Sequence, residues 1–232
     1  MRNPETVKMK TLLIAWMAAA ACLGSAFAAD RVELDQRVRT LTDKFETLQS
    51  QPDKRIPAGV LRKAQGIILL DRTKAGFMFA YQGGGGLALV RNPRTHQWSP
   101  IAFVSANEAS IGFQVGGEQT FFVLLLMNTN ATRLLTEPNF DFGGEARGTA
   151  GDLSAGAQGT VSQPLQPVLV YNDRKGLYGG AAMKAGAIAP DDTDNRIYYG
   201  QFVTMRDILF GRKVKSTPAA EALVERIADD SK

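Results

Sequence analysis

The sequence has almost none of the residues on which disulfides and transition-metal sites depend. Of its 232 residues, one is a cysteine (Cys22) and one is a histidine (His96). A disulfide framework needs paired cysteines and a zinc site needs several ligands, so this chain supplies neither. His96 lies in a polar stretch of turn-forming residues, 92–97, where we expect a solvent-exposed side chain. The stability of the protein must therefore come from packing.

Motifs for nucleotide and calcium binding are also absent. The four consecutive glycines at 83–86 are not followed by the Lys-Ser/Thr pair of a phosphate-binding loop. The acidic run 191–195 lacks the glycine and distal glutamate of an EF-hand, so we predict a turn or a helix cap there. A hydrolase built on carboxylates remains an alternative, although no motif relates Asp141, Glu145 and Asp152. We predict a protein that is not an enzyme and holds no cofactor or metal.

The N-terminal segment has the three parts of a secretion signal. Basic residues precede an apolar or small-residue stretch at 11–23, and Ala26-Phe27-Ala28 supplies a small-x-small cleavage site. We predict that residues 1–28 are removed and that the mature protein is periplasmic or secreted. The alternative is cleavage before Cys22 at a loose lipoprotein box, which would anchor the protein through an acylated cysteine. Both alternatives export the protein.

Little net charge remains once the signal is removed. The full chain carries a formal charge of +4, and residues 1–28 contain three basic residues and one acidic residue, which leaves +2. Nucleic acid normally requires a clearly basic face, so we expect no nucleic-acid partner. No other apolar stretch approaches the roughly 18 residues of a membrane-spanning helix. We expect a soluble or peripheral mature protein.

An amphipathic helix is predicted over residues 29–50. Apolar residues recur there at spacings of four and three, with charges of both signs between them: Leu34, Val38, Leu41, Phe45 and Leu48. Because the polar face mixes charges, we expect the apolar stripe to pack on the domain. Insertion into a membrane is the alternative.

Residues 51–232 are predicted to form one domain that is rich in strands and ends in helices. Helices are expected at 56–65, 130–136 and 205–210 and after Thr217, with Thr204 and Thr217 as caps and a polar loop at 195–200. Alternating patterns and turn residues predict strands at 66–70, 76–82, 87–91, 97–104, 110–115, 120–127, 141–150, 153–161, 167–171 and 177–184. Their many glycines mark bends and bulges. We predict an α+β fold: a strongly curved antiparallel β-sheet or barrel with helices at the N- and C-terminal ends.

Three groups of basic residues lie near predicted turns. Arg62 and Lys63 end the helix at 56–65. The segments 69–77 and 170–177 share a pattern of strand, polar turn, glycine and strand, as a recurring hairpin or an internal repeat, and their turns carry Arg72 with Lys74 and Arg174 with Lys175. Such residues are ordinarily solvated, or complement a helix dipole. The functional alternative is contact with an anionic ligand.

Several short motifs occur in an order and spacing typical of one domain family. They are Ile56-Pro57, Ala64-Gln65-Gly66-Ile67, Lys74-Ala75-Gly76-Phe77, Trp98-Ser99-Pro100, the Gly-Phe-Gln-Val-Gly-Gly-Glu run at 112–118, the Lys-Gly-Leu-Tyr-Gly-Gly run at 175–180, and the Asn-x-x-Tyr-Tyr-Gly element at 195–200. From about residue 53 to residue 210 the chain resembles the SYLF domain family. The resemblance implies a lipid-binding module. Eukaryotic members bind phosphoinositides and associate with actin patches, and bacteria carry exported versions.

We therefore predict a non-enzymatic exported module that docks on anionic phospholipid headgroups. The candidate headgroup-binding residues are Arg62, Lys63, Arg72, Lys74, Arg174 and Lys175. Each basic residue held near an anionic surface contributes roughly 1 kcal/mol, so these residues must share one face to act together. An envelope scaffold that binds a protein partner, with lipid binding incidental, is the alternative. An exported protein would meet little phosphoinositide or actin, so we do not expect those two partners.

Overall fold

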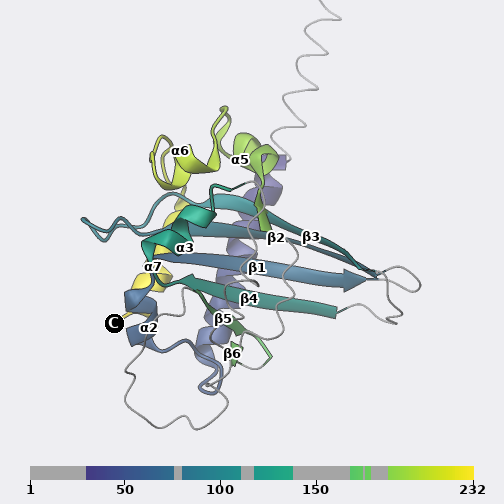
Figure 1. Cartoon of the computed structure of the whole chain (residues 1–232), viewed down its shortest axis with the longest axis vertical. Coiled ribbons are helices and arrows are strands. Elements are labelled where there is room, and N and C mark those ends of the chain that lie inside the picture. The colour runs from purple at the N-terminus through teal and green to yellow at the C-terminus, as the bar shows by residue number, and fades with distance from the viewer. Residues whose placement is uncertain (1–29, 76–79, 111–117, 138–167, 175, 179–187) are drawn as a thin grey trace, which may run out of the picture.

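A seven-stranded antiparallel sheet forms the centre of the protein (Figure 1). The computed structural model describes residues 30–75, 80–110, 118–137, 168–174, 176–178 and 188–232. The strand order is β6-β5-β4-β1-β2-β3-β7, with bounds β1 Gly66–Ala75, β2 Ala80–Val90, β3 Ala102–Ser110, β4 Glu118–Leu126, β5 Val168–Asn172, β6 Gly176–Tyr178 and β7 Ile188–Pro190. The described strands form an open sheet with β6 and β7 at its edges. The predicted α+β fold is confirmed. Of the two predicted forms, the described strands form a curved sheet and not a closed barrel.

Strand β1 lies at the centre of the sheet because it is apolar on both faces. Alternate residues of a strand point to opposite faces, so a continuous apolar run is buried on two sides. Ile67 and Leu69 belong to one core cluster, and Ile68 and Leu70 belong to the other. Helices must therefore cover both faces of the sheet.

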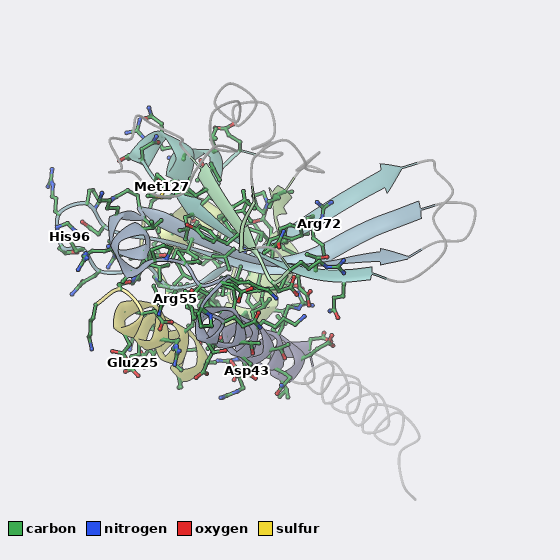
Figure 2. All side chains as sticks on the ribbon, turned by 90° about the horizontal axis from the view of Figure 1, so that it is seen from below. Asp43, Arg55, Arg72, His96, Met127 and Glu225 are labelled. Carbon is green, nitrogen blue, oxygen red and sulfur yellow. The ribbon has the colours of Figure 1, made fainter. Side chains whose placement is uncertain are left out.

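The N-terminal helix, described over residues 30–50, covers one face together with α7 (Pro218–Asp229), beside which it lies (Figure 2). All five residues of its predicted apolar stripe are at most 3% exposed. They share a core cluster with Leu223 and Ile227 of α7. The prediction that this helix packs on the domain is confirmed.

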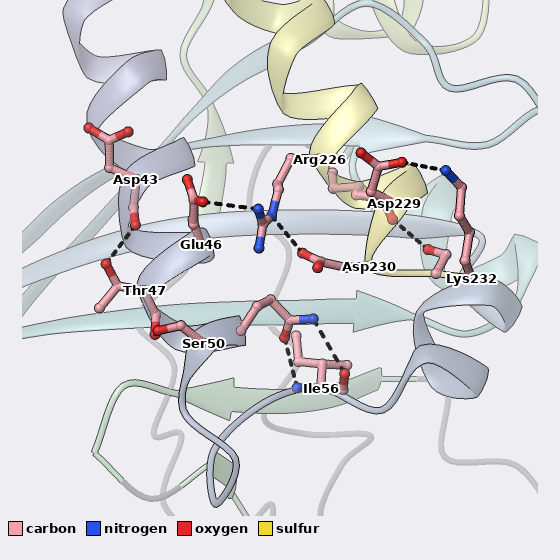
Figure 3. A network of polar contacts seen from close by, with 12 residues as sticks. Asp43, Glu46, Thr47, Ser50, Ile56, Arg226, Asp229, Asp230 and Lys232 are labelled. Carbon is pink, nitrogen blue, oxygen red and sulfur yellow. Dashed lines mark hydrogen bonds and ion pairs between the residues drawn. The ribbon is translucent and has the colours of Figure 1, made fainter.

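A polar contact also joins these two helices at their outer faces. Arg226 of α7 donates from Nη1 to Glu46 of the N-terminal helix at 2.9 Å and from Nε to Asp230 at 3.0 Å (Figure 3). The two ends of the described chain are thereby tied together.

The opposite face carries the short helices α3 (Thr129–Leu134) and α6 (Met205–Leu209). Thr204 caps α6 in a reciprocal capping box with Asp207, and Thr217 caps α7 by accepting a hydrogen bond from the Ala220 N–H. Both predicted caps are confirmed. The predicted helix at 56–65 is α2 (Ala58–Lys63), which lies at the end of the sheet where β1 begins.

Three local predictions are wrong. The predicted turn within 69–77 is part of β1, so only the segment 170–177 forms a hairpin turn, between β5 and β6. The predicted break between the strands 76–82 and 87–91 is absent, since residues 80–90 form one strand, β2, that contains the four glycines; residues 76–79 lie outside the described residues. The predicted polar loop at 195–200 is mostly the helix α5 (Asp192–Tyr199). In each case pairing with distant segments overrides the local turn chemistry.

The remaining strand predictions differ in their bounds or lie outside the described residues. The strand expected at 97–104 begins later, as β3, and β7 was not predicted. The strands expected at 141–150 and 153–161 and most of those at 110–115 and 177–184 lie outside the described residues. Asp191 caps α5 by accepting from the Asp194 N–H at 3.0 Å, so the expected turn or cap at 191–195 is confirmed as a cap.

Two glycines of β2 allow the close approach of β1. A Cβ added at Gly84 would lie 2.4 Å from the Asp71 carbonyl oxygen, and one added at Gly86 would lie 2.3 Å from the Leu69 carbonyl oxygen. No side chain fits in such a space without moving the backbone. Glycine is therefore required for strand packing at these two positions of the run.

Candidate functional site: an arginine-lined pocket

The five candidate headgroup-binding residues that the structure describes fall towards two opposite ends of β1. Arg62 and Lys63 are exposed in the last turn of α2, next to the beginning of the strand. Arg72 is six residues further along than Gly66, which is about 20 Å in an extended strand. Figure 2 shows Arg72 towards the end of the sheet that lies away from the loop carrying His96.

Only one of the two expected basic turns is present, because Arg72 and Lys74 lie within β1. Arg72 is only 7% exposed. Lys74 is paired in register with Gln82 and Glu118 inside the sheet. Arg174 lies in the β5–β6 turn and donates to the Gln119 carbonyl at 3.2 Å. Lys175 lies outside the described residues.

A pocket of about 400 Å³ lies at the end of the sheet near α2. It is enclosed by α3, α6 and the beginning of the loop that joins β2 to β3, three segments that Figure 1 shows at the same end of the sheet. Its charged lining is dominated by one residue type: Arg91, Arg133, Arg206 and Arg212, with Glu137 as the one carboxylate. Polar and apolar side chains complete the wall: Gln65, Val90, Asn92, Pro93, Thr129, Thr132, Thr136, Leu209 and Phe210.

Arg91 is held rigidly in the wall of this pocket. Its Nη1 donates to the carbonyl of Arg62 at 2.6 Å, and its guanidinium lies 4.5 Å from the centre of the Trp98 ring. Burial lowers the pKa of Arg91 from its usual value. Its Nε is buried and has no hydrogen-bond partner among the described residues.

The other three arginines come from three different segments. Arg212 has a left-handed backbone, with φ of 50°, and donates to the Gln97 carbonyl at 2.6 Å. Arg206 of α6 donates to the Thr136 hydroxyl at 3.3 Å. Arg133 of α3 is exposed, and its side chain makes no hydrogen bond or ion pair within the described part of the chain.

The capping box of α6 fixes the helix that carries Arg206. The Asp207 carboxylate accepts from Thr204 and pairs with Lys213 at 2.7 Å. The hydrogen bond from Lys213, followed by those from Thr204, lowers the pKa of Asp207 to about 2. This carboxylate is therefore ionised at neutral pH and already engaged by its own helix end.

The pocket arginines were not predicted from the sequence. They lie far apart in the chain and share no motif, so tertiary contacts alone bring them together. Arg62, which was predicted, adjoins the pocket through its carbonyl contact with Arg91. The carboxylates Asp141, Glu145 and Asp152 lie outside the described residues.

His96 is exposed in the loop between β2 and β3, as expected, with a positive φ of 56°. Within the described ranges, no three His, Cys, Asp or Glu side chains gather closely enough to hold a metal ion. No helix in the described part of the chain is long and apolar enough to cross a membrane.

Comparison with known proteins identifies relatives over most of the chain. Residues 107–229 match the model of the Ysc84 family, described as "Las17-binding protein actin regulator". Protein YSC84 of Saccharomyces cerevisiae is 34% identical over 176 residues, which is 74% of this chain and 37% of the yeast protein. The SH3 domain-containing YSC84-like protein 1 of Xenopus laevis is 30% identical over 191 residues, which is 80% of this chain and 57% of that protein.

LAS seventeen-binding protein 3 of Saccharomyces cerevisiae is 31% identical over 175 residues, covering 74% of this chain and 38% of the relative. No solved structure matches the chain. The chain thus spans between about a third and three fifths of these relatives. The family model and the relatives confirm the resemblance drawn from the motifs, and the chain belongs to the Ysc84 (SYLF-domain) family of binding and regulatory modules.

Proposed function

We propose that the protein is a non-enzymatic exported module that docks on anionic phospholipid headgroups through one end of its sheet. We call this surface the basic end and define it by seven residues: Arg62, Lys63, Arg91, Arg94, Arg133, Arg206 and Arg212. The observation that carries the proposal is that four of these side chains, Arg91, Arg133, Arg206 and Arg212, line one pocket. The other three lie next to it in the chain: the Arg62 carbonyl accepts from Arg91, Lys63 follows Arg62, and Arg94 follows the wall residue Pro93.

The strength of such docking follows from the number of charges that act together. Each Lys or Arg near an anionic bilayer contributes roughly 1 kcal/mol, so a group of this size supports binding where one pair does not. Among the described residues of the pocket wall, Glu137 is the one carboxylate. The local excess of positive charge is therefore large, although the net charge of the mature chain would be small.

The set of candidate headgroup-binding residues on this surface differs from the set predicted from the sequence. Arg62 and Lys63 are retained. Arg72 is buried in the sheet and is not proposed to contact lipid. Arg174 is exposed but lies towards the other end of β1, where the backbone of Lys74 also lies, and Lys175 is outside the described residues. Arg174, Lys74 and Lys175 are kept as a secondary candidate contact and are not part of the basic end.

Exposed aromatic side chains support a membrane-facing role for this end. Phe202 precedes α6 and is 86% exposed, and Phe210 follows α6, is 40% exposed and lines the pocket. Aromatic residues beside basic residues can enter the headgroup boundary while the cations contact phosphate. We propose that these two side chains insert shallowly.

Vesicle co-sedimentation tests the docking proposal. The protein is expected to bind vesicles of phosphatidylglycerol with phosphatidylcholine at low salt, to be released at high salt, and to ignore pure phosphatidylcholine. The triple variant Arg62→Ala, Lys63→Ala, Arg94→Ala should bind several-fold more weakly. As a control, Arg31→Ala with Arg39→Ala removes exposed charges from the N-terminal helix and should bind normally. Binding that is equal on both vesicle types would contradict the proposal.

The export proposal rests on the signal segment and has its own test. The intact mass of the protein purified from the cell envelope or medium should correspond to a chain that begins after Ala28. A mass that corresponds to a lipidated chain beginning at Cys22 would establish the lipoprotein alternative. A full-length cytoplasmic chain would overturn export.

The second candidate is a protein-interaction module for which lipid is incidental. The family description and the name of LAS seventeen-binding protein 3 favour it, because both refer to a protein partner. This chain spans only 37% to 57% of the relatives compared, so the partners of those whole proteins are not transferred to it. Full retention of vesicle binding by the triple variant, or no vesicle binding at all, would favour this candidate.

A further inference from the structure

The arginine-lined pocket also bears on ligand binding. The ligand in question enters the pocket, whereas the membrane of the proposed function lies against it. We infer that this pocket binds one small molecule or headgroup that carries a phosphomonoester. The inference deepens the proposed function, since a lipid headgroup is one source of such a group and a free phosphate ester is the other.

The donors in the pocket are the first argument. Each guanidinium has five N–H donors in a rigid fork that matches the oxygens of a phosphate. Hydrogen bonds within the described part of the chain use one donor each from Arg91, Arg206 and Arg212, and none from Arg133. Most of the donors that these four residues carry therefore have no acceptor among the described residues.

The buried Nε of Arg91 is a more specific sign. Buried polar groups in folded proteins nearly always have a partner, so a buried donor without one calls for an explanation. Arg91 is itself a wall residue, and burial already lowers its pKa. The Nε atom itself is closed to solvent, so an anion in the pocket would stabilise this desolvated cation through its charge and through the other N–H groups of the guanidinium.

Three of the four pocket arginines are also held in place before any ligand arrives. Arg91 is fixed by the Arg62 carbonyl and the Trp98 ring, Arg212 by the Gln97 carbonyl, and Arg206 by Thr136. A ligand that binds groups already ordered loses less conformational freedom than one that must order them. Such preorganisation is typical of a site and is not required of solvated surface arginines.

The volume of the pocket and its other lining residues indicate a small ligand that has both polar and apolar parts. A volume of about 400 Å³ is within the usual range for small-molecule sites, roughly 300–1,000 Å³. Leu209 and Phe210 offer apolar contact, whereas Thr129 and Asn92 offer polar contact. A glycerol phosphate or similar unit has the corresponding parts: a dianion, polar hydroxyls and a short carbon chain.

Glu137 allows a substitution whose effect on ligand affinity can be predicted in sign. It is the one carboxylate in the wall and it repels an anion that enters. Removal of its charge in Glu137→Gln should tighten the binding of a phosphomonoester. If the pocket bound no ligand, Glu137→Gln would have no binding affinity to increase.

Titration calorimetry with the full chain tests the inference, with glycerol 3-phosphate as the probe and glycerol as the uncharged comparison. We expect saturable binding of one molecule per chain and none for glycerol. The double variant Arg133→Gln, Arg206→Gln should lose about tenfold or more in affinity. Glu137→Gln should bind more tightly, and Arg31→Gln with Arg39→Gln should be unchanged. Because Arg133 and Arg206 are exposed, the double variant should keep the thermal stability of the wild type.

Vesicles distinguish the two sources of the phosphate. Preference for phosphatidic acid over phosphatidylglycerol, lost in the double variant, would assign the pocket to a lipid headgroup. Binding of glycerol 3-phosphate without binding to any vesicle would support the inference with a free ester as ligand and would overturn the docking proposal. Equal binding to both anionic vesicles without saturable binding of the soluble probe would overturn the inference and leave the docking proposal standing.

Discussion

The side chain of Asn195 pairs with the backbone of Phe103 through both of its polar atoms. Its Oδ1 accepts from the Phe103 N–H at 2.8 Å, and its Nδ2 donates to the Phe103 carbonyl at 3.3 Å. Asn195 is fully buried, so it fixes α5 to β3 as a further strand would. The first residue of the Asn-x-x-Tyr-Tyr-Gly element therefore has a structural role.

Asn195→Ala should destabilise the protein by about 1–3 kcal/mol, because it leaves the buried Phe103 N–H without an acceptor. Urea unfolding followed by circular dichroism measures this loss. Arg196→Ala, at an exposed position of the same helix, is the matched control and should change stability by less than about 0.5 kcal/mol. Equal effects at the two positions would show that the Asn195 contact contributes nothing.

Neighbouring glycines of β2 should respond differently to the same substitution. Gly86→Ala brings a Cβ to 2.3 Å from the Leu69 carbonyl oxygen, so β1 and β2 must separate, at a cost of about 1–3 kcal/mol or more. Gly85→Ala meets its nearest atom, Arg37 Nη1, at 3.4 Å and should be tolerated. Melting temperatures of the two variants measure the difference, and a Gly86 variant as stable as the Gly85 variant would contradict the close packing.

The N-terminal helix should behave as a core element. Phe45 is fully buried, and Phe45→Ala should cost about 3–5 kcal/mol in unfolding free energy. Val32→Ala changes a residue that is 70% exposed on the same helix and should leave stability unaltered. If Phe45→Ala instead weakened vesicle binding at unchanged stability, the helix would have to leave the domain in order to act on membranes.

Stability should fall in alkaline solution because buried tyrosines resist ionisation. Burial raises the pKa of Tyr171 and of Tyr198 to about 12 from the usual 10.0. The unfolded chain therefore releases these protons at lower pH than the folded chain. The stabilising contribution is present below pH 10.0 and is lost as the pH rises towards about 12. Tyrosinate absorbance against pH follows the titration, and the difference between the wild type and Tyr198→Phe isolates the Tyr198 ring. A difference that appears near pH 10.0 in the folded protein would contradict the burial of Tyr198.

Some elements could be predicted from the sequence because their determinants are local. The stripe of the N-terminal helix depends on a spacing that only a helix brings to one face. The caps at Thr204 and Thr217 depend on side chains within three residues of the helix start. Neither requires knowledge of the rest of the chain.

Other elements could not be predicted because distant residues decide them. The polar residue Asp71 continues β1 because its carboxylate is met by Lys44 of the N-terminal helix and by Gln119 of β4. In α5, Asn195 and Tyr198 look polar in sequence, yet both are buried with partners elsewhere. The turn-forming residues of a local segment do not reveal such partners.

The pocket was the feature least open to prediction from the sequence, for the same reason. Its arginines occupy four segments that only the sheet and its covering helices bring together. The sequence did indicate Arg62 and Lys63, which adjoin the pocket, because they end a helix next to a strand. It could not distinguish them from Arg72, whose burial depends on the pairing of β1 on both sides.

The bond between Glu46 and Arg226 joins residues 180 positions apart, and that between Asp35 and Tyr198 spans 163. The apolar stripe of the first described helix therefore has no complete partner until α7 has been synthesised. A nascent chain that stops before residue 218 leaves this stripe without α7. Packing of the stripe must wait until residues 218–229 have emerged from the ribosome, which leaves an interval in which a chaperone can keep the chain unfolded.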